Sequence, residues 1–420
     1  MEHSPTQKHI VIVGAGFAGV RAALDLLREN IPHAKITLIN SRYHFEYTPA
    51  LYRVVTGNSP LEVCVPLSEI FSDHDKRIEV VIDTITDHMG DQKKVVGASG
   101  SEYHYDFLVL ALGSETAYFN IPGLKENSFG FKSIAEALRL KNHLHTLFEN
   151  HHTLSPEEQG DNLRVVIVGG GPAGVELAGK LAEYGKILAK RHGMDVHSLE
   201  IILIEGASRL LPSLPEEVSK GVVGALAREH VKVILGTPVA KVEKEKVFLP
   251  NQEFATKTIV WSAGIKVNSL YDALLPNVER NKQGRIIVDE YLRPQGKEAQ
   301  ENIFVAGDAA ATPYSGLAQT ANHDGAYIAR MLARLLRNRD MSPYIPKKVA
   351  YALPIGSKFT AFVSGKSVIF GLIAKFIREA ADFRFFLSIL PFGKAMRAFQ
   401  EGKKVCEACA TCNPPAGGRG

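Results

Sequence analysis

Two parts of the chain share one pattern, a short apolar run followed at once by a glycine-rich turn and an amphipathic stretch. In the first part, residues 9–13 read HIVIV, GAGFAG follows, and VRAALDLLREN continues toward Pro32. Short apolar runs that end at glycine indicate buried strands, and the apolar spacing after the turn indicates a helix. KITLIN, residues 35–40, supplies a second strand, so the pattern predicts a β-α-β unit.

The same order of elements returns in the middle of the chain. Residues 164–168 (RVVIV) precede GGGPAG, a helical stretch follows, and LEIILIE closes a second β-α-β unit at Glu205. Two more apolar runs that end in glycine-containing turns, residues 104–113 and 257–265, match each other, so the duplication extends beyond the glycine turns. A third such run, ENIFVAGDAA, precedes a helical stretch at residues 320–338. The chain is therefore predicted to be α/β with two Rossmann-like units.

Both glycine turns have the spacing G-x-G-x-x-G, which suits a dinucleotide. The first glycine permits a tight turn, the second lets the backbone approach a pyrophosphate, and the third allows close packing of helix on strand. The helix N-terminus then favours the negative phosphates. The expected contacts come from Gly14, Gly16, Phe17, Ala18 and Gly19 in the first turn, and from Gly169, Gly171, Pro172, Ala173 and Gly174 in the second.

The residue that ends the second strand differs between the two units. Glu205 can accept hydrogen bonds from both ribose hydroxyls and would repel a 2′-phosphate, which favours NADH over NADPH. Asn40 holds the equivalent place in the first unit, where the charged acceptor is missing, and it could instead begin a turn. Asp308, in VAGDAA, follows an apolar run; taken alone, a Gly-Asp pair is common in turns.

Composition narrows the class of protein. The chain has 420 residues, of which 45% are hydrophobic and 22% charged, and a net charge of +4 that gives no argument for nucleic acid. The sequence has no run of 18 apolar residues, so no membrane-spanning helix is expected, and no apolar targeting segment precedes the first strand. Cys64, Cys406, Cys409 and Cys412 form no disulfide framework, and no metal site is expected. The three C-terminal thiols could be inert or serve a redox or lipidation role.

Together these residues resemble the two-dinucleotide-binding flavoproteins, and within them the type II NADH dehydrogenases, single-subunit NADH:quinone oxidoreductases of the respiratory chain. The resemblance runs from about Lys8 to Gly402. Its distinguishing segments are YHFEYTPALYRVVTG (43–57), GGGPAGVELAGKLAE (169–183), VWSAG (260–264), GLAQTANHDGAYIA (316–329) and FRFFLSILPFGKAMRAF (383–399). It implies FAD and NADH as cofactors and a membrane quinone as the acceptor, with hydride passing from NADH to the flavin and two electrons passing on, without proton pumping.

The resemblance also assigns residues to the site. Thr48 and Pro49 would lie beside the isoalloxazine, Asp308 would hold the ribityl chain, and Glu176 would lie near the nicotinamide and the flavin. Glu176 could also be a carboxylate stabilised by its helix N-terminus. Further cofactor-binding candidates are Asn40, Arg42, Val81, Ala111, Gly113, Gly307, Ala318, Gln319, Glu205, Ala263 and Gly264.

The quinone-side motif of the family, A-Q-x-A-x-Q-Q-G, is only partly present. It is kept at Ala318, Gln319, Ala321 and Gly325. His323 and Asp324 replace the two glutamines. Because imidazole titrates near neutrality, His323 could pass a proton to the quinone, or it could simply hydrogen-bond its neighbours. The catalytic candidates are Glu176, Gln319 and His323.

The C-terminal stretch is basic and aromatic. Between Ile345 and Lys404 there are eleven Lys or Arg, three Asp or Glu, and ten Phe or Tyr. Residues 366–379 (KSVIFGLIAKFIRE) would form an interfacial helix on an anionic membrane surface, although a basic face over core phenylalanines would show the same pattern. We therefore expect a peripheral membrane protein at the cytoplasmic face of the inner or plasma membrane; a homodimer stays open.

Other flavoproteins of this fold stay as alternatives. A sulfide:quinone oxidoreductase needs paired cysteines in the body of the chain, where only Cys64 stands, and a thioredoxin-reductase-like enzyme needs a C-x-x-C in its nucleotide domain. A ferredoxin reductase would have similar nucleotide sites without the C-terminal stretch. A redox sensor resembling apoptosis-inducing factor would hold NADH without rapid turnover.

The motifs divide the chain into expected domains. The polar residues 150–163 are predicted to connect two of them. The FAD-binding domain is expected in two parts, residues 1–125 and 285–341, with the NADH-binding domain, residues 126–284, between them. A membrane-binding region, residues 342–404, and a disordered tail, residues 405–420, are expected to follow.

Overall fold

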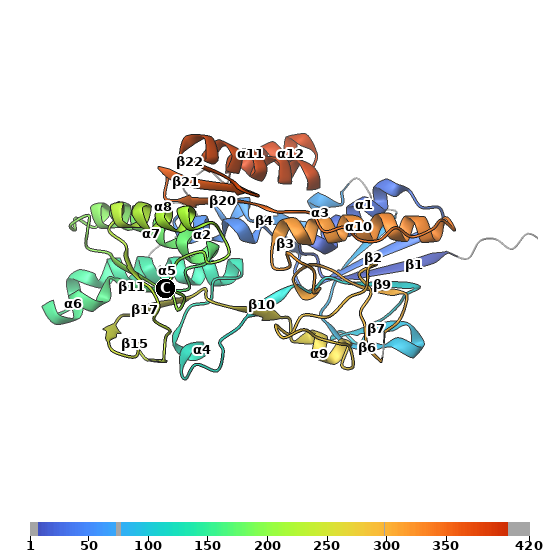
Figure 1. Cartoon of the computed structure of the whole chain (residues 1–420), viewed down its shortest axis with the longest axis horizontal. Coiled ribbons are helices and arrows are strands. Elements are labelled where there is room, and N and C mark those ends of the chain that lie inside the picture. The colour runs from blue at the N-terminus through green and yellow to red at the C-terminus, as the bar shows by residue number, and fades with distance from the viewer. Residues whose placement is uncertain (1–6, 73–76, 298, 402–420) are drawn as a thin grey trace, which may run out of the picture.

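The computed structural model describes residues 7–72, 77–297 and 299–401 (Figure 1). The predicted disordered tail, residues 405–420 with three of the four cysteines, lies outside these residues. Two α/β halves stand side by side, and a smaller C-terminal layer lies above them.

The first half is built on a five-stranded parallel sheet in the order β19-β9-β1-β2-β5. Its strands are β1 (Lys8–Val13), β2 (Ala34–Asn40), β5 (Ile78–Ile82), β9 (Phe107–Leu110) and β19 (Ile303–Val305). These strands are mostly apolar because helices and loops cover both faces of the sheet. Helices α1 (Phe17–Glu29) and α10 (Ala318–Leu336) pack against each other. A Cβ on Gly325 would lie 2.2 Å from the Ala18 carbonyl oxygen, so glycine permits this close approach.

The second half repeats this plan with a four-stranded parallel sheet in the order β13-β12-β11-β17. The strands are β11 (Arg164–Val168), β12 (Glu200–Ile204), β13 (Lys232–Ile234) and β17 (Thr258–Trp261), and the main helices are α5 (Ile134–Asn150), α7 (Pro172–Arg191) and α8 (Glu216–Arg228). The predicted fold class, α/β with two Rossmann-like units, is confirmed. The second sheet is inserted between β9 and β19 of the first, while the domain boundaries themselves stay predictions.

Shorter elements connect and cover the two sheets. They are β3 (His44–Glu46), η1 (Thr48–Ala50), α2 (Leu51–Val55), η2 (Pro60–Glu62), β4 (Cys64–Pro66), α3 (Leu67–Ile70), β6 (Ile85–Met89), η3 (Gly90–Gln92), β7 (Lys94–Gly97), β8 (Glu102–His104), β10 (Ser114–Thr116), α4 (Leu124–Asn127), β14 (Lys241–Glu243), β15 (Lys246–Phe248), β16 (Glu253–Ala255), β18 (Ile265–Val267), α9 (Leu270–Leu274) and η5 (Gly307–Ala309). The antiparallel pair β10–β18 links the two halves.

The C-terminal layer consists of a three-stranded antiparallel sheet and two helices. Its elements are β20 (Ala350–Ile355), β21 (Phe359–Ser364), β22 (Ser367–Phe370), α11 (Leu372–Ile389) and α12 (Phe392–Glu401). Strand β20 packs against α7 of the second half, and α11 reaches α1 of the first (Figure 1). The C-terminal layer therefore contacts both α/β halves.

The polar residues 150–163, predicted to connect two domains, are mostly helical: they form η4 (His151–Thr153) and α6 (Pro156–Asn162), because Ser155 and Glu158 make a capping box that starts α6. One prediction about local structure was wrong. Residues 366–379 are not one helix: their first part is strand β22, and Gly371, with φ of +83°, separates it from α11. Within the part of the chain that the structure describes, no helix is long and apolar enough to cross a membrane.

Candidate active site

The two glycine turns have matching geometry. Gly14 and Gly169 have φ of +102° and +117°, a region that residues with a side chain rarely adopt. A Cβ on Gly14 would lie 2.5 Å from the Ala111 oxygen, and one on Gly169 would lie 2.7 Å from Ala263 Cα. Ala111 and Ala263, both predicted site residues, thus lie directly beside the turns.

The remaining glycines fit a bound dinucleotide. A Cβ on Gly19 or Gly174 would lie 1.8 or 1.9 Å from the carbonyl oxygen of the first glycine in its own turn, so both helices sit close to their strands. By contrast, nothing lies within 4 Å of a Cβ on Gly16 or Gly171. The N-termini of α1 and α7 are therefore open at the positions where phosphates would approach.

Asn40 and Glu205 hold equivalent places. The Ala15 N–H donates to Asn40 Oδ1 at 2.9 Å, and the Gly170 N–H donates to Glu205 Oε2 at 2.6 Å. The Ala207 N–H donates to the other Glu205 oxygen at 2.8 Å. Each side chain therefore orders its own turn. The Glu205 carboxylate keeps acceptor positions for ribose hydroxyls, because its two oxygens offer about four lone-pair sites.

Asp308 lies in η5, directly after β19, with two partners that the motifs did not indicate. Ser114 Oγ donates to Asp308 Oδ2, and Lys132 Nζ lies 2.7 Å from Ser114 Oγ and 3.7 Å from Asp308 Oδ2. A pocket of about 200 Å³ opens beside them, lined by Ser114, Ile265, Lys266, Val267, Gln283, Arg285 and Asp308. The predicted ribityl-binding carboxylate therefore faces open space next to a lysine.

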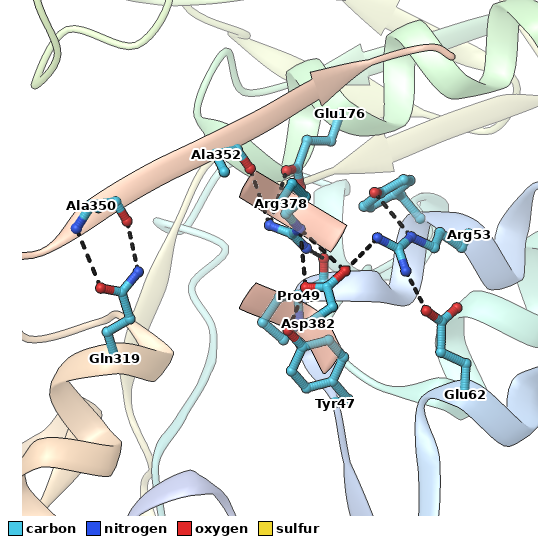
Figure 2. A network of polar contacts seen from close by, with 11 residues as sticks. Tyr47, Pro49, Arg53, Glu62, Glu176, Gln319, Ala350, Ala352, Arg378 and Asp382 are labelled. Atoms are coloured by element: carbon cyan, nitrogen blue, oxygen red, sulfur yellow. Dashed lines mark hydrogen bonds and ion pairs between the residues drawn. The ribbon is translucent and has the colours of Figure 1, made fainter. Parts of the chain in front are cut away.

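Glu176, on α7, is buried and lies close to the first half of the chain (Figure 2). Its Oε1 is 3.9 Å from Nη1 of Arg378 on α11. Arg378 also donates to the Pro49 carbonyl oxygen and to the Ala352 carbonyl oxygen, each at 3.1 Å, and its Nε lies 3.1 Å from Asp382 Oδ1. One guanidinium thus joins the loop of the first half, the helix of the second half and the C-terminal layer.

Asp382 is the centre of this buried cluster. Its Oδ2 accepts a hydrogen bond from Arg53 Nη2 at 2.6 Å, and its Oδ1 accepts one from the Tyr47 hydroxyl at 2.7 Å. Arg53 also pairs with Glu62, which is 1% exposed and has one oxygen without a hydrogen-bond partner among the described residues. The cluster therefore contains three carboxyl groups and two guanidinium groups.

The two arginines act differently on the carboxyl groups. Burial raises the pKa of Glu176 to about 7, although Arg378 and Arg53 oppose this shift. Burial also raises the pKa of Glu62 against the effect of Arg53. For Asp382 burial acts in the same direction, but Arg378 and Arg53 hold its pKa below the usual value. Within the cluster, Glu176 is therefore a carboxyl group whose pKa lies close to neutrality.

Gln319 and His323 contact a different part of the structure. The Gln319 amide donates to the Ala350 oxygen at 2.6 Å and accepts from the Ala350 N–H at 3.3 Å (Figure 2). His323 Nε2 lies 2.9 Å from the Ile345 oxygen, and burial lowers the pKa of the imidazole. Ala350 belongs to β20, whose Ala352 oxygen accepts from Arg378, so this edge strand connects the Gln319 side of the site to the cluster.

The other predicted residues are distributed over strands, helix N-termini and loops of both halves. Arg42 is exposed and pairs with Glu46, Thr48 is exposed at the start of η1, and Val81 lies within β5. Gly113 follows β9, Gly307 follows β19 and Gly264 follows β17. Ala318 is the first residue of α10, directly after the preceding loop. Phe17, at the start of α1, contacts Phe45, Tyr47 and Phe385. Pro172 and Ala173 are exposed on the first turn of α7.

The sequence motifs missed most of the buried cluster. Arg53 lies within segment 43–57 of the family resemblance, but no sequence pattern indicated that its side chain is buried. Arg378 and Asp382 are spaced four apart on a mostly apolar helix, and that spacing was the available signal, because such a pair shares one helix face.

Comparisons with known proteins agree with this geometry. A family model described as pyridine nucleotide-disulphide oxidoreductase matches residues 8–325. The type II NADH:quinone oxidoreductase of Staphylococcus haemolyticus (strain JCSC1435) is 27% identical over 417 residues, covering 94% of this chain and 99% of the relative. The protein of the same name from Staphylococcus aureus (strain NCTC 8325 / PS 47) is 29% identical over 413 residues, with the same coverage.

Solved structures share the fold. NDH2 of Plasmodium falciparum in complex with NADH superposes with a TM-score of 0.84 at 18% identity, covering 94% of this chain and 97% of that one. The sulfide:quinone oxidoreductase of Aquifex aeolicus gives a TM-score of 0.74 at 20% identity, covering 93% and 92%. At these identities the likeness shows the fold alone.

The buried cluster makes a prediction about stability. Asp382→Asn removes the carboxylate between two buried arginines, and we expect the free energy of unfolding to fall by about 3–5 kcal/mol, because the uncompensated charges stay buried. Urea denaturation of the two proteins measures this. The control Lys220→Ala removes a surface ion pair with Glu216 and should cost less than about 1 kcal/mol. An equally small loss for Asp382→Asn would contradict the role given to the cluster.

Proposed function

The chain belongs to the pyridine nucleotide-disulphide oxidoreductase family, and from this premise we propose that it is an FAD-dependent NADH:quinone oxidoreductase of type II, a non-proton-pumping NADH dehydrogenase. The observation that carries the proposal is the position of Arg378, which joins Glu176 of the second nucleotide unit to the Pro49 carbonyl of the first. The resemblance found in the sequence is confirmed at the level of the family. A sulfide:quinone oxidoreductase is disfavoured because Cys64 is the one cysteine ahead of residue 406.

FAD and NADH are the cofactors. FAD fits the first unit, where the Gly14–Gly19 turn, Asn40 and Asp308 would hold the pyrophosphate, adenosine and ribityl parts. NADH fits the second unit, where the Gly169–Gly174 turn and Glu205 would hold the pyrophosphate and the ribose. Bound flavin supplies the chemistry of accepting hydride from NADH and passing two electrons to a membrane quinone.

Among the catalytic candidates, Glu176 is best suited to hold and release the proton that a quinone needs on reduction. Its pKa of about 7 leaves a sizeable fraction of each protonation state near neutral pH. His323 is less suited, because its lowered pKa leaves it mostly neutral and its Nε2–H already donates to the Ile345 carbonyl. Gln319 would have to release Ala350 before its amide could bind a quinone oxygen.

Glu205 makes the preference for NADH testable. We expect the wild-type holoprotein to use NADH in strong preference to NADPH, because the carboxylate repels a 2′-phosphate. Glu205→Gln keeps an acceptor for the Gly170 N–H but removes the charge. It should lower the ratio of kcat/KM with NADH to kcat/KM with NADPH by about 10- to 100-fold. Steady-state turnover with a water-soluble quinone measures both ratios.

The control for this test is Glu200→Gln at the other end of the same strand, where the side chain pairs with Arg164. It should leave the ratio unchanged. A Glu205→Gln protein with the wild-type ratio would show that Glu205 does not read the ribose, and a wild type without turnover would count against the enzyme itself.

We also propose that the C-terminal layer binds a membrane surface. Leu372, Ile373 and Phe376 on α11 are each at least 65% exposed, and Phe392 at the start of α12 is 66% exposed. Exposed apolar side chains within a basic region fit the interface of an anionic bilayer. The protein would then be peripheral, at the cytoplasmic face of the membrane that contains its quinone. The homodimer stays a prediction.

Vesicle sedimentation tests this membrane surface. Replacing both Ile373 and Phe376 by serine should lower the fraction of protein bound to anionic phospholipid vesicles by at least about tenfold. The reason is that two apolar side chains buried in the bilayer contribute roughly 3 kcal/mol or more to the free energy of binding. Met89→Ser is the matched control, since Met89 is 37% exposed on β6, which packs against β7 and α9 on the side of the molecule opposite the C-terminal layer (Figure 1). Unchanged binding of the double variant would place the membrane contact elsewhere.

A further inference from the structure

The two residues that depart from the quinone-side motif, His323 and Asp324, are neighbours on α10 with different surroundings. His323 is partly exposed and contacts the Ile345 carbonyl. Asp324 is 0% exposed. A buried carboxyl group needs hydrogen-bond partners, and these partners indicate what it does.

Each Asp324 oxygen has one donor. The Tyr344 hydroxyl donates to Oδ1 at 2.6 Å, and the Gly307 N–H donates to Oδ2 at 3.0 Å. Gly307 has φ of +76° and directly precedes Asp308 in η5. Asp324 therefore holds the backbone turn that presents Asp308, and Tyr344 holds Asp324.

The segment that carries Tyr344 is attached along one face of α10. The Tyr327 hydroxyl donates to the Ser342 oxygen at 2.8 Å, His323 contacts the Ile345 oxygen, and Gln319 pairs with Ala350. Residues 319, 323 and 327 are spaced by four and so share this face. Because several contacts hold the segment, the position of Tyr344 does not depend on any one of them.

The charge of Asp324 is not offset by a nearby cation. In the described ranges no lysine or arginine is paired with it, and burial raises its pKa to about 7, helped by the nearby Asp308 and opposed by Tyr344 and the Gly307 N–H. The group is thus placed for its hydrogen bonds rather than for an ion pair.

We propose that Asp324, held by Tyr344, is a positioning residue for FAD: it fixes the Gly307–Asp308 turn so that the Asp308 carboxylate reaches the ribityl chain. This inference rests on the proposed function, because it requires FAD in the first nucleotide unit. It gives the departure from the quinone-side motif a role at the flavin instead of at the quinone.

The experiment measures the FAD dissociation constant from the flavin fluorescence released on dilution of the holoprotein. Asp324→Ala should raise this constant about 10- to 100-fold, because the hydrogen bond that holds the turn and the partner of Tyr344 are both lost. Tyr344→Phe should raise it by a smaller factor. The matched control is Tyr327→Phe, which removes a hydroxyl that holds the same segment but does not contact Asp324. This variant should leave the FAD dissociation constant unchanged.

A double-mutant cycle with Asp308→Asn separates positioning from general loss of structure. If Asp324 acts through Asp308, then Asp324→Ala should have little further effect in the Asp308→Asn background, whereas a structural defect would add in full. Additive effects, or an Asp324→Ala protein with wild-type FAD affinity, would overturn the inference alone. A wild type that takes up no FAD would overturn the proposed function and this inference with it.

Discussion

The buried contact between Asp382 and two arginines is the constraint on which the rest of the structure depends. Asp382 and Arg378 come from α11, Arg53 comes from the first half, and the same Arg378 reaches Glu176 in the second half. Leaving a buried charge unpaired is costly, so the cluster favours the arrangement of the three parts in which these charges are paired. The nucleotide units and the C-terminal layer therefore share one fixed point beside the predicted flavin loop.

The same constraint explains why one carboxyl group titrates near neutrality while another stays charged. Asp382 lies within hydrogen-bond distance of both guanidinium groups, and they outweigh the effect of burial. Glu176 is 3.9 Å from Arg378, too far for a hydrogen bond, so burial dominates and its pKa rises to about 7. The longer distance to Arg378 thus accompanies the raised pKa of Glu176, and the closer pairing with both arginines accompanies the lowered pKa of Asp382.

The fold and the nucleotide turns were predictable from the sequence because their signals are local. Apolar runs before G-x-G-x-x-G and the repeat of that order gave both sheets, and Asn40 and Glu205 do occupy equivalent places. The charged cluster was not predictable, because Arg53 and Asp382 are 329 residues apart and no local pattern joins them. Asp324 was noticed as a departure, but only the fold shows that it faces Gly307 rather than the opposite side of α10.

The central claim is that the two nucleotide units would hold FAD and NADH, that FAD would supply the electron transfer from NADH to a quinone, and that Glu176 would supply a proton. Anaerobic stopped-flow absorbance of the holoprotein, reduced with NADH and then mixed with a quinone at a series of pH values, tests this claim most directly. The account predicts that NADH bleaches the flavin, and that the rate of reoxidation falls as the pH rises through about 7 in the wild type, because Glu176 loses its proton there. In Glu176→Gln this dependence should disappear. Flavin that stays oxidised in NADH, or the same pH dependence in both proteins, would contradict the account.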